Sequence, residues 1–370
     1  MLTLFKSLRR LKDEKLFLAL LILLFAFISL HVDLSNMWKS VDWNTITSLT
    51  GLLIVSTAIK ESGLFAKISL RMAKHLHSER TLAVFLVTIS AIFSMFLTND
   101  ITLFIVVPLT LSLQDFLAND VKKLVIFEAL AVNVGSTLSP IGNPQNLFLW
   151  HEWNVSFFDF IVRLLPLEIS MMALFFLFTL FVFKKKALML TAKNVRKVDF
   201  NLALISTIAL IVYVTCMQFG WEEFVVAPLF IFYFFYKRSA LKKVDWFLLA
   251  TFILMFLDVH FLTQFESVKT LVKSLNVSTT QRTFLFSLLS SQMMSNVPAA
   301  IFVSKFSKAY LAIVYGVNIG GNGIVIGSLA NLIALRMAKS KGIYTKFHVY
   351  SFPYFFLSAF LGYFMLNFVF

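Results

Sequence analysis

The sequence has little charge and almost no cysteine. Asp, Glu, Lys and Arg make up only 14% of its 370 residues. So few charged side chains could not cover the surface of a soluble domain of this size, which excludes that class of protein. The single cysteine, Cys216, lies in an apolar run, has no partner for an intrachain disulfide, and is expected to fill space there.

Signatures of catalysis are also missing from the sequence. It contains no Ser, His and Asp hydrolase motif, no glycine-rich nucleotide loop, no histidine pair at positions i and i+4, and no cysteine cluster. An enzyme and an ATP-driven pump are therefore disfavoured. We expect a protein that needs no cofactor and binds no metal other than Na⁺ as a coupling ion.

Long apolar runs dominate what is present. Hydrophobic residues make up 59% of the chain, and 44 residues are phenylalanine. Runs of roughly 17–25 apolar residues are long enough to cross a bilayer as helices, so the sequence predicts an all-α polytopic membrane protein with about ten to eleven membrane segments. The clear spans are expected at 16–32, 45–62, 161–183, 200–219, 224–236, 245–264 and 346–369.

The basic residues, 33 Lys and Arg against 19 Asp and Glu, gather in short links between these runs. This distribution is typical of cytoplasmic links, so the expected partner is the lipid bilayer of the cell (inner) membrane and not nucleic acid, with the N-terminus cytoplasmic. The cytoplasmic links hold Lys67, Arg71, Lys74 and Arg80; Lys184, Lys185, Lys186, Lys193, Arg196 and Lys197; and Lys237, Arg238, Lys242 and Lys243. The outer links hold Asp33, Asp42, His151, Glu152, Glu222 and Glu223, with Lys269, Lys273 and Arg282 as an exception.

Two regions of the chain repeat each other. The segment "NVGSTLSPIGNPQN" (133–146) aligns without gaps on "NIGGNGIVIGSLAN" (318–331). Upstream, "SMFLTND" (94–100) aligns on "SQMMSNV" (291–297), and "VDW" occurs at 41–43 and 244–246. The helices after the two "VDW" segments run in opposite directions by the charge rule, so the sequence predicts inverted repeats with interrupted helices, an architecture of secondary transporters.

The predicted halves divide the chain at its basic link. Residues 1–199 form the first half, with a hairpin at about 82–113, a broken helix at about 121–150, the helix 161–183 and the basic cytoplasmic link. Residues 200–370 form the second half, with a hairpin at about 283–306, a broken helix at about 309–336 and the last helix 346–369. The order of hairpin and broken helix is the same in both.

The helix breaks are candidate binding sites, because backbone N–H and C=O groups inside a membrane need hydrogen-bond partners or ligands. Non-helical backbone survives in hydrocarbon only where protein or water covers it, so the stretch with Gly135, Pro140, Gly142 and Pro144 is expected to line an internal cavity. Freed carbonyl oxygens suit a hard cation such as Na⁺, and N–H groups at half-helix starts suit an anion. The segments Thr98-Asn99-Asp100 and Ser295-Asn296-Val297 are expected to be polar tips of re-entrant hairpins. The alternative is a tight turn between two full helices.

These four motifs resemble the ion transporter superfamily, which contains divalent anion:sodium symporters, citrate transporters, arsenite permeases and sodium-proton antiporters. The resemblance implies a homodimer in which two transport domains move like elevators against a scaffold. It implies two cation sites, formed by Ser94, Thr98, Asn99 and Gly135 and by Ser291, Ser295, Asn296 and Gly320. It places the substrate between Asn99 and Asn296, near Asn143, Pro144 and Ser328. The neighbouring tip residues Asp100 and Val297 are candidates for the same substrate site.

The third tip position departs from the dicarboxylate branch, where it is threonine. It is Asp100 in the first hairpin and Val297 in the second. A carboxylate beside an anion site repels a divalent anion unless the carboxylate is protonated or neutralised by a cation. This favours the arsenite-permease and antiporter branches over the dicarboxylate branch. Asp100 is a candidate for coupling to H⁺ or Na⁺ and equally a candidate helix cap. Lys305 could attract an anion, but an extended position toward the surface is favoured.

The expected function is secondary active transport of a small anion, a carboxylate or an inorganic oxyanion, coupled to Na⁺ or H⁺ by alternating access. The alternatives are Na⁺/H⁺ antiport with Asp100 as the carrier, or an arsenite-type efflux permease of the same fold. An ion channel is a more remote alternative.

Overall fold

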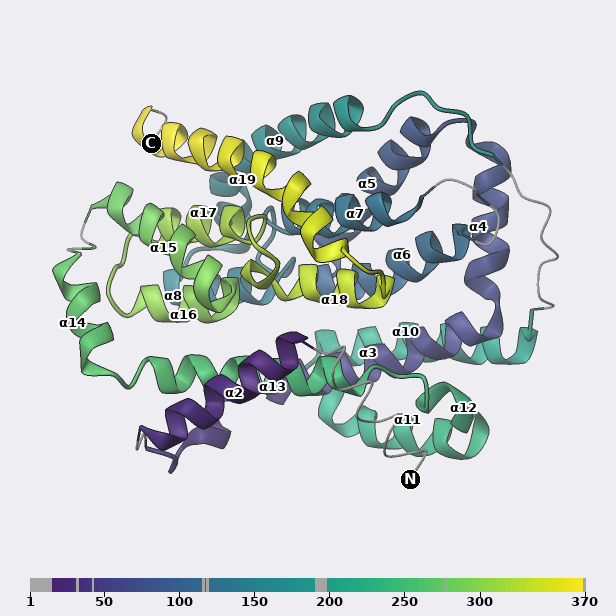
Figure 1. The fold of residues 1–370 in the computed structure, drawn as a ribbon, viewed down its shortest axis with the longest axis horizontal. Coiled ribbons are helices and arrows are strands. Elements are labelled where there is room, and N and C mark those ends of the chain that lie inside the picture. Colours follow the sequence, from purple (N-terminus) through teal and green to yellow (C-terminus); the bar gives the residue numbers. More distant parts are fainter. Residues whose placement is uncertain are drawn as a thin grey trace. The chain divides into compact units, whose positions relative to one another are not determined.

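The computed structural model describes residues 15–30, 33–41, 43–114, 117, 120–189, 198–275, 277 and 279–368. The regular elements in these ranges are helical, which confirms the all-α class (Figure 1). Three predictions concern residues outside the described ranges: the basic N-terminus, the acidic link residue Asp42, and the part of the basic link that holds Lys193, Arg196 and Lys197.

The chain forms two compact units. The smaller unit comprises Met1–Thr57 and Ala209–Leu275, and the larger unit comprises Ala58–Ile208 and Asn276–Phe370. Each unit thus takes one stretch from each predicted half of the sequence. The units are described separately below.

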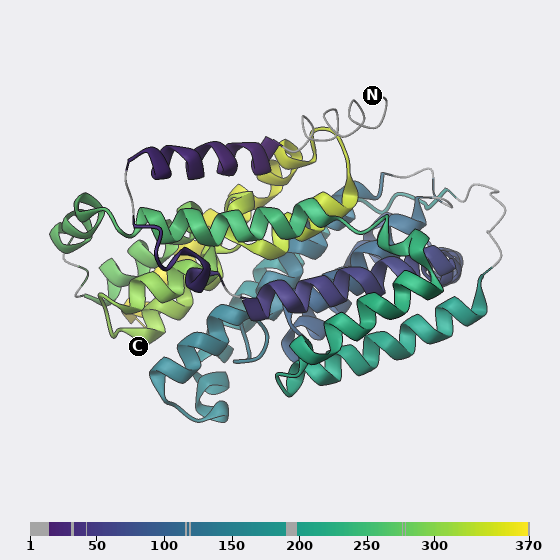
Figure 2. The ribbon, with the colours of Figure 1, turned by 90° about the horizontal axis from the view of Figure 1, so that it is seen from below.

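The smaller unit is a set of apolar helices. Its main internal contact joins α2 to α13, which lie along each other (Figures 1 and 2) and meet through Phe27 and Phe261 at 6.3 Å between ring centroids. The Tyr213 hydroxyl donates a hydrogen bond to the Thr47 carbonyl at 2.8 Å, which ties α10 to α3. Its elements are α2 (Lys15–Ser29), η1 (Met37–Ser40), most of α3 (Trp43–Ser62), part of α10 (Phe200–Gln218), α11 (Glu222–Tyr236), α12 (Arg238–Leu241), α13 (Trp246–Leu262) and α14 (Glu266–Ser274).

The larger unit contains both hairpins and both broken helices. The first hairpin (α5, α6) packs on α7, and the second (α15, α16) packs on α17. The second arm of each hairpin also contacts the broken helix of the other half: α6 packs against α18, and α16 packs against α8. Its elements are α4 (Leu64–His75), α5 (Glu79–Phe96), α6 (Asn99–Leu113), α7 (Lys122–Gly135), α8 (Pro144–Trp153), α9 (Phe157–Val182), α15 (Thr280–Met294), α16 (Asn296–Ser304), α17 (Tyr310–Gly320), η2 (Val325–Gly327), α18 (Leu329–Ala338) and α19 (Ile343–Phe368).

Local sequence explains where these helices start. Ser78 begins α5 with a capping box, in which its hydroxyl accepts from the Thr81 N–H and the Thr81 hydroxyl accepts from the Ser78 N–H. Ser156 caps α9 by accepting from the Asp159 N–H at 3.1 Å. Gly63, at φ 80°, turns the chain between α3 and the basic helix α4, a conformation that glycine adopts without steric cost.

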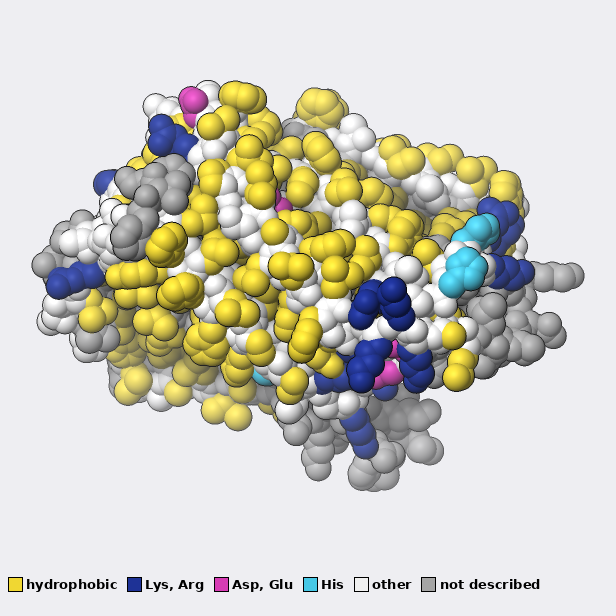
Figure 3. All heavy atoms as spheres, turned by 90° about the horizontal axis from the view of Figure 1, so that it is seen from above, with side chains coloured by type: hydrophobic (Ala, Val, Ile, Leu, Met, Phe, Trp, Pro, Cys, Tyr) yellow, Lys and Arg dark blue, Asp and Glu magenta, His cyan; other side chains and the backbone are white. Residues whose placement is uncertain are grey.

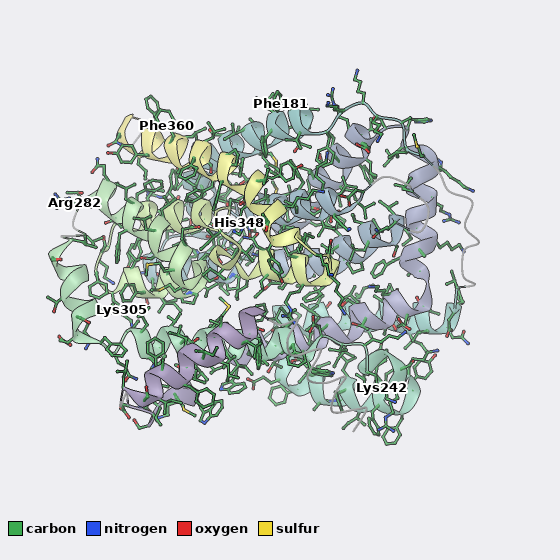
Figure 4. The ribbon with its side chains drawn as sticks, in the orientation of Figure 1. Phe181, Lys242, Arg282, Lys305, His348 and Phe360 are labelled. Carbon is green, nitrogen blue, oxygen red and sulfur yellow. The ribbon has the colours of Figure 1, made fainter. Side chains whose placement is uncertain are left out.

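The surface of the larger unit suits lipid. Among the described residues, three helices are long and apolar enough to cross a membrane: α5, α9 and α19. Phe181 on α9 is 86% exposed and Phe360 on α19 is 73% exposed, and both point outward in Figure 4. The face drawn in Figure 3 is largely hydrophobic. Phenylalanine at this exposure would be unfavourable in water, so a polytopic membrane protein is the class that fits.

Candidate functional site

Both predicted helix interruptions are present. Helix α7 ends at Gly135 and α8 begins at Pro144, while α17 ends at Gly320 and α18 begins at Leu329. The aligned glycines therefore end aligned helices. Asn143 and Ser328, which also align, are the N-cap residues of α8 and α18. Proline suits the first helical position of α8 because that position needs no N–H donor.

The glycines bring each broken helix against its hairpin. A Cβ atom at Gly135 would lie 2.2 Å from the Ala91 carbonyl oxygen and 2.6 Å from the Ser94 hydroxyl. At Gly320 it would lie 2.6 Å from the Ser291 Cβ and 2.8 Å from its hydroxyl. The structure thus brings together two pairs that the resemblance places in the cation sites, Ser94 with Gly135 and Ser291 with Gly320.

The hairpin tips are shorter than the sequence predicted. Asn99 and Asp100 lie in the first turn of α6, and Asn296 and Val297 lie in the first turn of α16, so these residues are helical and not loop residues. The reason in the first hairpin is Thr98, whose hydroxyl accepts from the Ile101 N–H at 3.3 Å. The N-cap residue is therefore Thr98 and not Asp100, while Asp100 lies in the first turn of α6, where a carboxylate favours the helix dipole as the alternative role predicted.

The two breaks are joined by a buried group of side chains that we call the asparagine core: Asn133, Asn143, Asn146, Asn318, Ser328 and Asn331. Asn133 of the first half donates to Asn331 Oδ1 at 2.9 Å and accepts from the Ser328 hydroxyl at 2.9 Å. Asn318 of the second half donates to Asn146 Oδ1 at 2.7 Å and accepts from Asn143 Nδ2 at 3.1 Å. Each half thus reaches into the break of the other in the same way.

The amide groups of the asparagine core also donate hydrogen bonds to backbone carbonyls that the helix breaks leave without helical partners. Asn146 Nδ2 donates to the carbonyls of Ser136, Thr137 and Ser139, at 3.0–3.2 Å. Asn331 Nδ2 donates to the Gly321 carbonyl at 2.7 Å, and Gly321 aligns with Ser136. A buried carbonyl without a partner costs about 1–3 kcal/mol, so these amides stabilise the interrupted backbone.

Several oxygens in this region lack a hydrogen-bond donor within the described part of the chain. They are Asn99 Oδ1 and Asp100 Oδ1 at the first tip, Gln145 Oε1 in α8, and Asn322 Oδ1 after α17. All four side chains are at most 8% exposed. The Asn99 N–H donates to the Gly142 carbonyl at 2.9 Å, which fixes the first tip against the first break. Buried oxygens without donors are the ligands that a hard cation requires.

The second tip differs in its bonding. Asn296 Oδ1 accepts from the Ser295 hydroxyl at 3.3 Å and from the Val297 N–H at 3.0 Å. The Gly320 carbonyl accepts from Gln292 Nε2 at 2.7 Å, while Gln292 Oε1 accepts from the Ile324 N–H at 2.8 Å. Two oxygens of the residues predicted to bind a cation in the second half, Asn296 Oδ1 and the Gly320 carbonyl, are therefore bonded to protein donors.

The residues assigned to substrate lie in two places. Asn143 and Ser328 belong to the asparagine core, and Pro144 starts α8 beside them. Asn99, Asp100, Asn296 and Val297 lie at the N-termini of α6 and α16. The Asn296 Nδ2 atom would lie 3.4 Å from a Cβ atom on Gly321, so the second tip also adjoins its own break.

Sequence reasoning missed much of the asparagine core as site residues. Asn133, Asn146, Asn318 and Asn331 are the identities that the repeat alignment matched, so the signal was present. Gln292 was also missed, because its aligned residue is Met95 and the repeat gives no signal there.

Other ionisable side chains belong to neither tip and neither break. The Thr110 hydroxyl donates to Glu128 Oε1, which joins α6 to α7. Glu168 is buried in α9, and neither of its carboxylate oxygens has a partner within the described residues. Asp258 belongs to the smaller unit. Lys305 is exposed just beyond α16 (Figure 4), as favoured from the sequence.

Comparisons with known proteins identify the family of this chain. A sequence model of the citrate transporter family matches residues 14–309. The chain is 38% identical over 363 residues to inner membrane protein YbiR of Escherichia coli, with 97% of each chain covered. It is 36% identical over 303 residues to an uncharacterized transporter of Methanocaldococcus jannaschii, covering 80% of this chain and 82% of that one. It is 25% identical over 155 residues to silicon efflux transporter LSI3 of rice, covering 42% of this chain and 32% of that one.

Proposed function

Because this chain belongs to the citrate transporter family and is a multi-pass membrane transporter, we propose that it is a secondary active carrier of a small anion. The observation that carries the proposal is the pair of interrupted helices joined by the asparagine core. Interrupted helices at corresponding positions of two repeats are where such carriers hold substrate and coupling ion. The cargo we propose is a carboxylate or an inorganic oxyanion, and the driving ion is Na⁺ or H⁺.

We place the coupling cation at the first tip. Asn99 Oδ1 and Asp100 Oδ1 are buried there without a donor among the described residues. The Ser94 hydroxyl lies against the Gly135 backbone. With Thr98 and Asn99, these two residues make up the cation set that the sequence suggested, and Asp100 is the coupling carboxylate that we add to it. A buried carboxylate is costly unless a cation or a proton neutralises it. Binding of a cation or a proton to Asp100 is therefore linked to closure of the transport site around it.

We place the anion against the N-termini of α6 and α16. Backbone N–H groups and the positive end of the helix dipole favour an anion at such a position. Asn99 and Asn296 begin these helices and carry amide groups that suit an oxyanion. Similarity to a silicon efflux transporter supports including an inorganic oxyacid or its anion in this substrate class.

The motion we propose is of the elevator type. The asparagine core and both tips belong to the larger unit, so this unit would carry the cargo while the smaller unit acts as scaffold. The reciprocal bonds and packing of the two halves support inverted repeats. A homodimer in the inner membrane, with a cytoplasmic N-terminus, completes the proposal.

A second candidate is cation/proton exchange or arsenite-type efflux. It is favoured by Asp100, a carboxylate where the dicarboxylate branch has threonine, whose Oδ1 atom has no donor within the described part of the chain. A single buried carboxylate that alternately binds a proton and Na⁺ is sufficient for exchange.

Uptake by proteoliposomes separates the two candidates. Purified protein is reconstituted, Na⁺ and proton gradients are imposed in turn, and labelled carboxylates, arsenite and silicate are offered. The proposed carrier shows saturable anion uptake that requires one of the gradients. Na⁺ flux that is independent of any anion would favour exchange, and continuous conductance without counterflow would indicate a channel.

A further inference from the structure

A cavity of about 310 Å³ lies in the larger unit, away from the asparagine core. Its polar lining comes from three lysines, Lys123, Lys186 and Lys346, and two carboxylates, Glu79 and Asp120. The remaining wall is largely apolar and includes the ring of Phe183. The volume falls at the small end of ligand sites, which span roughly 300–1,000 Å³.

The cavity lies at one end of the three helices that are able to cross a membrane. Glu79 is the first residue of α5, Phe183 follows the last residue of α9, and Lys346 lies in the first turn of α19. These ends define one membrane surface, because each helix leaves the bilayer there. The neighbouring basic residues Arg80 and Lys184 mark that surface as cytoplasmic by the charge rule.

Contacts hold Lys346, Asp120 and Lys123 at the cavity, and the five charged residues of the lining sum to one positive charge. Lys346 Nζ lies 2.7 Å from Asp120 Oδ2. Burial raises the pKa of the Asp120 carboxyl, but hydrogen bonds from Lys346 and from the Lys122 N–H outweigh burial and lower it, so the carboxylate is ionised. Lys123 Nζ is 4.1 Å from the centre of the Phe183 ring, a cation–π contact that holds the ammonium group at the wall.

The position of Phe183 is itself fixed. Arg80 Nε donates to the Phe183 carbonyl at 2.8 Å, and the Phe183 ring packs edge-on against Phe127 at 4.9 Å between centroids. The Glu79 N–H donates to the Lys186 carbonyl at 2.8 Å, which brings the segment after α9 to the start of α5. Side-chain and backbone contacts therefore fix this part of the cavity wall.

We propose that this cavity binds the phosphate of an anionic phospholipid headgroup on the cytoplasmic side of the membrane. Three ammonium groups around two carboxylates offer one uncompensated positive charge, which matches a phosphodiester. The apolar wall suits the glycerol and the start of the acyl chains, and basic pockets between membrane helices are a known means of lipid recognition. The site is separate from the proposed transport site, so it can be tested whether or not the transport proposal holds.

The test measures the thermal midpoint of purified full-length protein in detergent. Short-chain phosphatidylglycerol, short-chain phosphatidylcholine, glycerol 3-phosphate and inorganic phosphate are added in separate titrations. We expect phosphatidylglycerol to raise the midpoint and phosphatidylcholine to leave it unchanged. Equal effects of the two lipids would overturn the proposal. An equal effect of either soluble phosphate at the same concentration would also overturn it, because the site would then bind a soluble anion.

Variants then locate the effect. The double variant Lys123→Gln, Lys186→Gln should weaken the apparent affinity for phosphatidylglycerol at least about tenfold, while Lys305→Gln, which removes an exposed lysine elsewhere in the larger unit, should leave it unchanged. If the double variant does not fold, Lys186→Gln alone, on the exposed segment after α9, is expected to weaken binding several-fold. Full lipid stabilisation in the folded variant would overturn the site.

Discussion

The two hairpin tips align in sequence but differ in what they leave unpaired. In the first tip, Thr98 caps the helix, and oxygens of Asn99 and Asp100 have no donor among the described residues. In the second tip, Asn296 Oδ1 accepts hydrogen bonds from the neighbouring Ser295 hydroxyl and Val297 N–H. The first tip therefore keeps the buried oxygens that the proposed cation site requires, whereas the Asn296 oxygen of the second tip is satisfied within the protein.

The two breaks differ at one aligned pair of residues, although Asn322 Oδ1 in the second break also has no donor among the described residues. Gln292 of the second half donates to the Gly320 carbonyl, an oxygen that the resemblance assigns to a cation. The aligned residue of the first half is Met95, which has no amide to offer, and its carbonyl instead accepts from the Ser139 hydroxyl at 2.6 Å. In the second half a neutral amide thus donates to the carbonyl that was predicted to bind a cation. We therefore expect a cation site in the first half and not in the second.

The largest effect is expected from removing the charge at the first tip. Asp100→Asn keeps the shape and loses a charged ligand worth roughly 1.5–3 kcal/mol, so gradient-driven uptake should fall roughly 10- to 100-fold. The aligned change in the second tip, Val297→Ala, should lower uptake far less. Initial rates in proteoliposomes check this, and equal losses in the two variants would remove the distinction between the tips.

The next comparison adds a methyl group at the two helix ends. Gly135→Ala should destabilise the protein by about 2–3 kcal/mol, because the new Cβ meets the Ala91 backbone oxygen at 2.2 Å. Gly320→Ala should cost about 1–2 kcal/mol, because the nearest atoms belong to the Ser291 side chain.

A second substitution sharpens this comparison. Ser291→Gly should restore much of the stability of Gly320→Ala, whereas Ser94→Gly should not restore Gly135→Ala, since the Ala91 carbonyl remains. Thermal midpoints of the two single and two double variants are the measurement. Rescue of both pairs, or of neither, would contradict the contacts on which the comparison rests.

Much of this contrast could not be predicted from the sequence. Glycine, proline and asparagine predicted the interruptions, and the repeat alignment found the residues at which α7 and α17 end and α6 and α16 begin. The tips were predicted too long, because a threonine cap brings Asn99 and Asp100 into a helix. The amphipathic helices α4 and α14 were not predicted, because a search for long apolar runs does not detect them.

The asparagine core lay beyond sequence reasoning for a different reason. Its bonds join residues more than 170 positions apart, such as Asn146 and Asn318, and pattern within one segment does not specify its partner. The same holds for the two compact units, which combine stretches from both predicted halves. The opposed orientation of the halves in the membrane stays a prediction.

Glycine at the aligned tip positions should change stability in opposite directions. Ser295 adopts φ 72° and ψ 158°, a region that costs an L residue of order 1–3 kcal/mol, so Ser295→Gly should stabilise the protein by roughly 1 kcal/mol. Thr98→Gly removes a cap in relaxed backbone and should destabilise by roughly 0.5–1 kcal/mol. Thermal midpoints that move in the same direction would contradict the assigned backbone.

The smallest effect is expected at the end of the second hairpin. Lys305 is exposed beyond α16, so Lys305→Ala should change the uptake rate less than about twofold, as is usual for surface positions. The measurement is the dependence of initial rate on anion concentration. A large rise in KM would indicate that Lys305 attracts the anion, the alternative that the sequence left open.

The central claim is that the unpaired oxygens of the first tip hold the coupling cation. The most direct measurement is the thermal midpoint of purified wild type, Asp100→Asn and Gln292→Met while Na⁺ concentration and pH are varied separately. A cation that binds only the folded protein raises the midpoint. We expect the midpoint to rise with Na⁺ or with protons in wild type and in Gln292→Met, and this rise to be lost in Asp100→Asn. A full rise in Asp100→Asn, together with its loss in Gln292→Met, would place the ion in the second half and contradict the account.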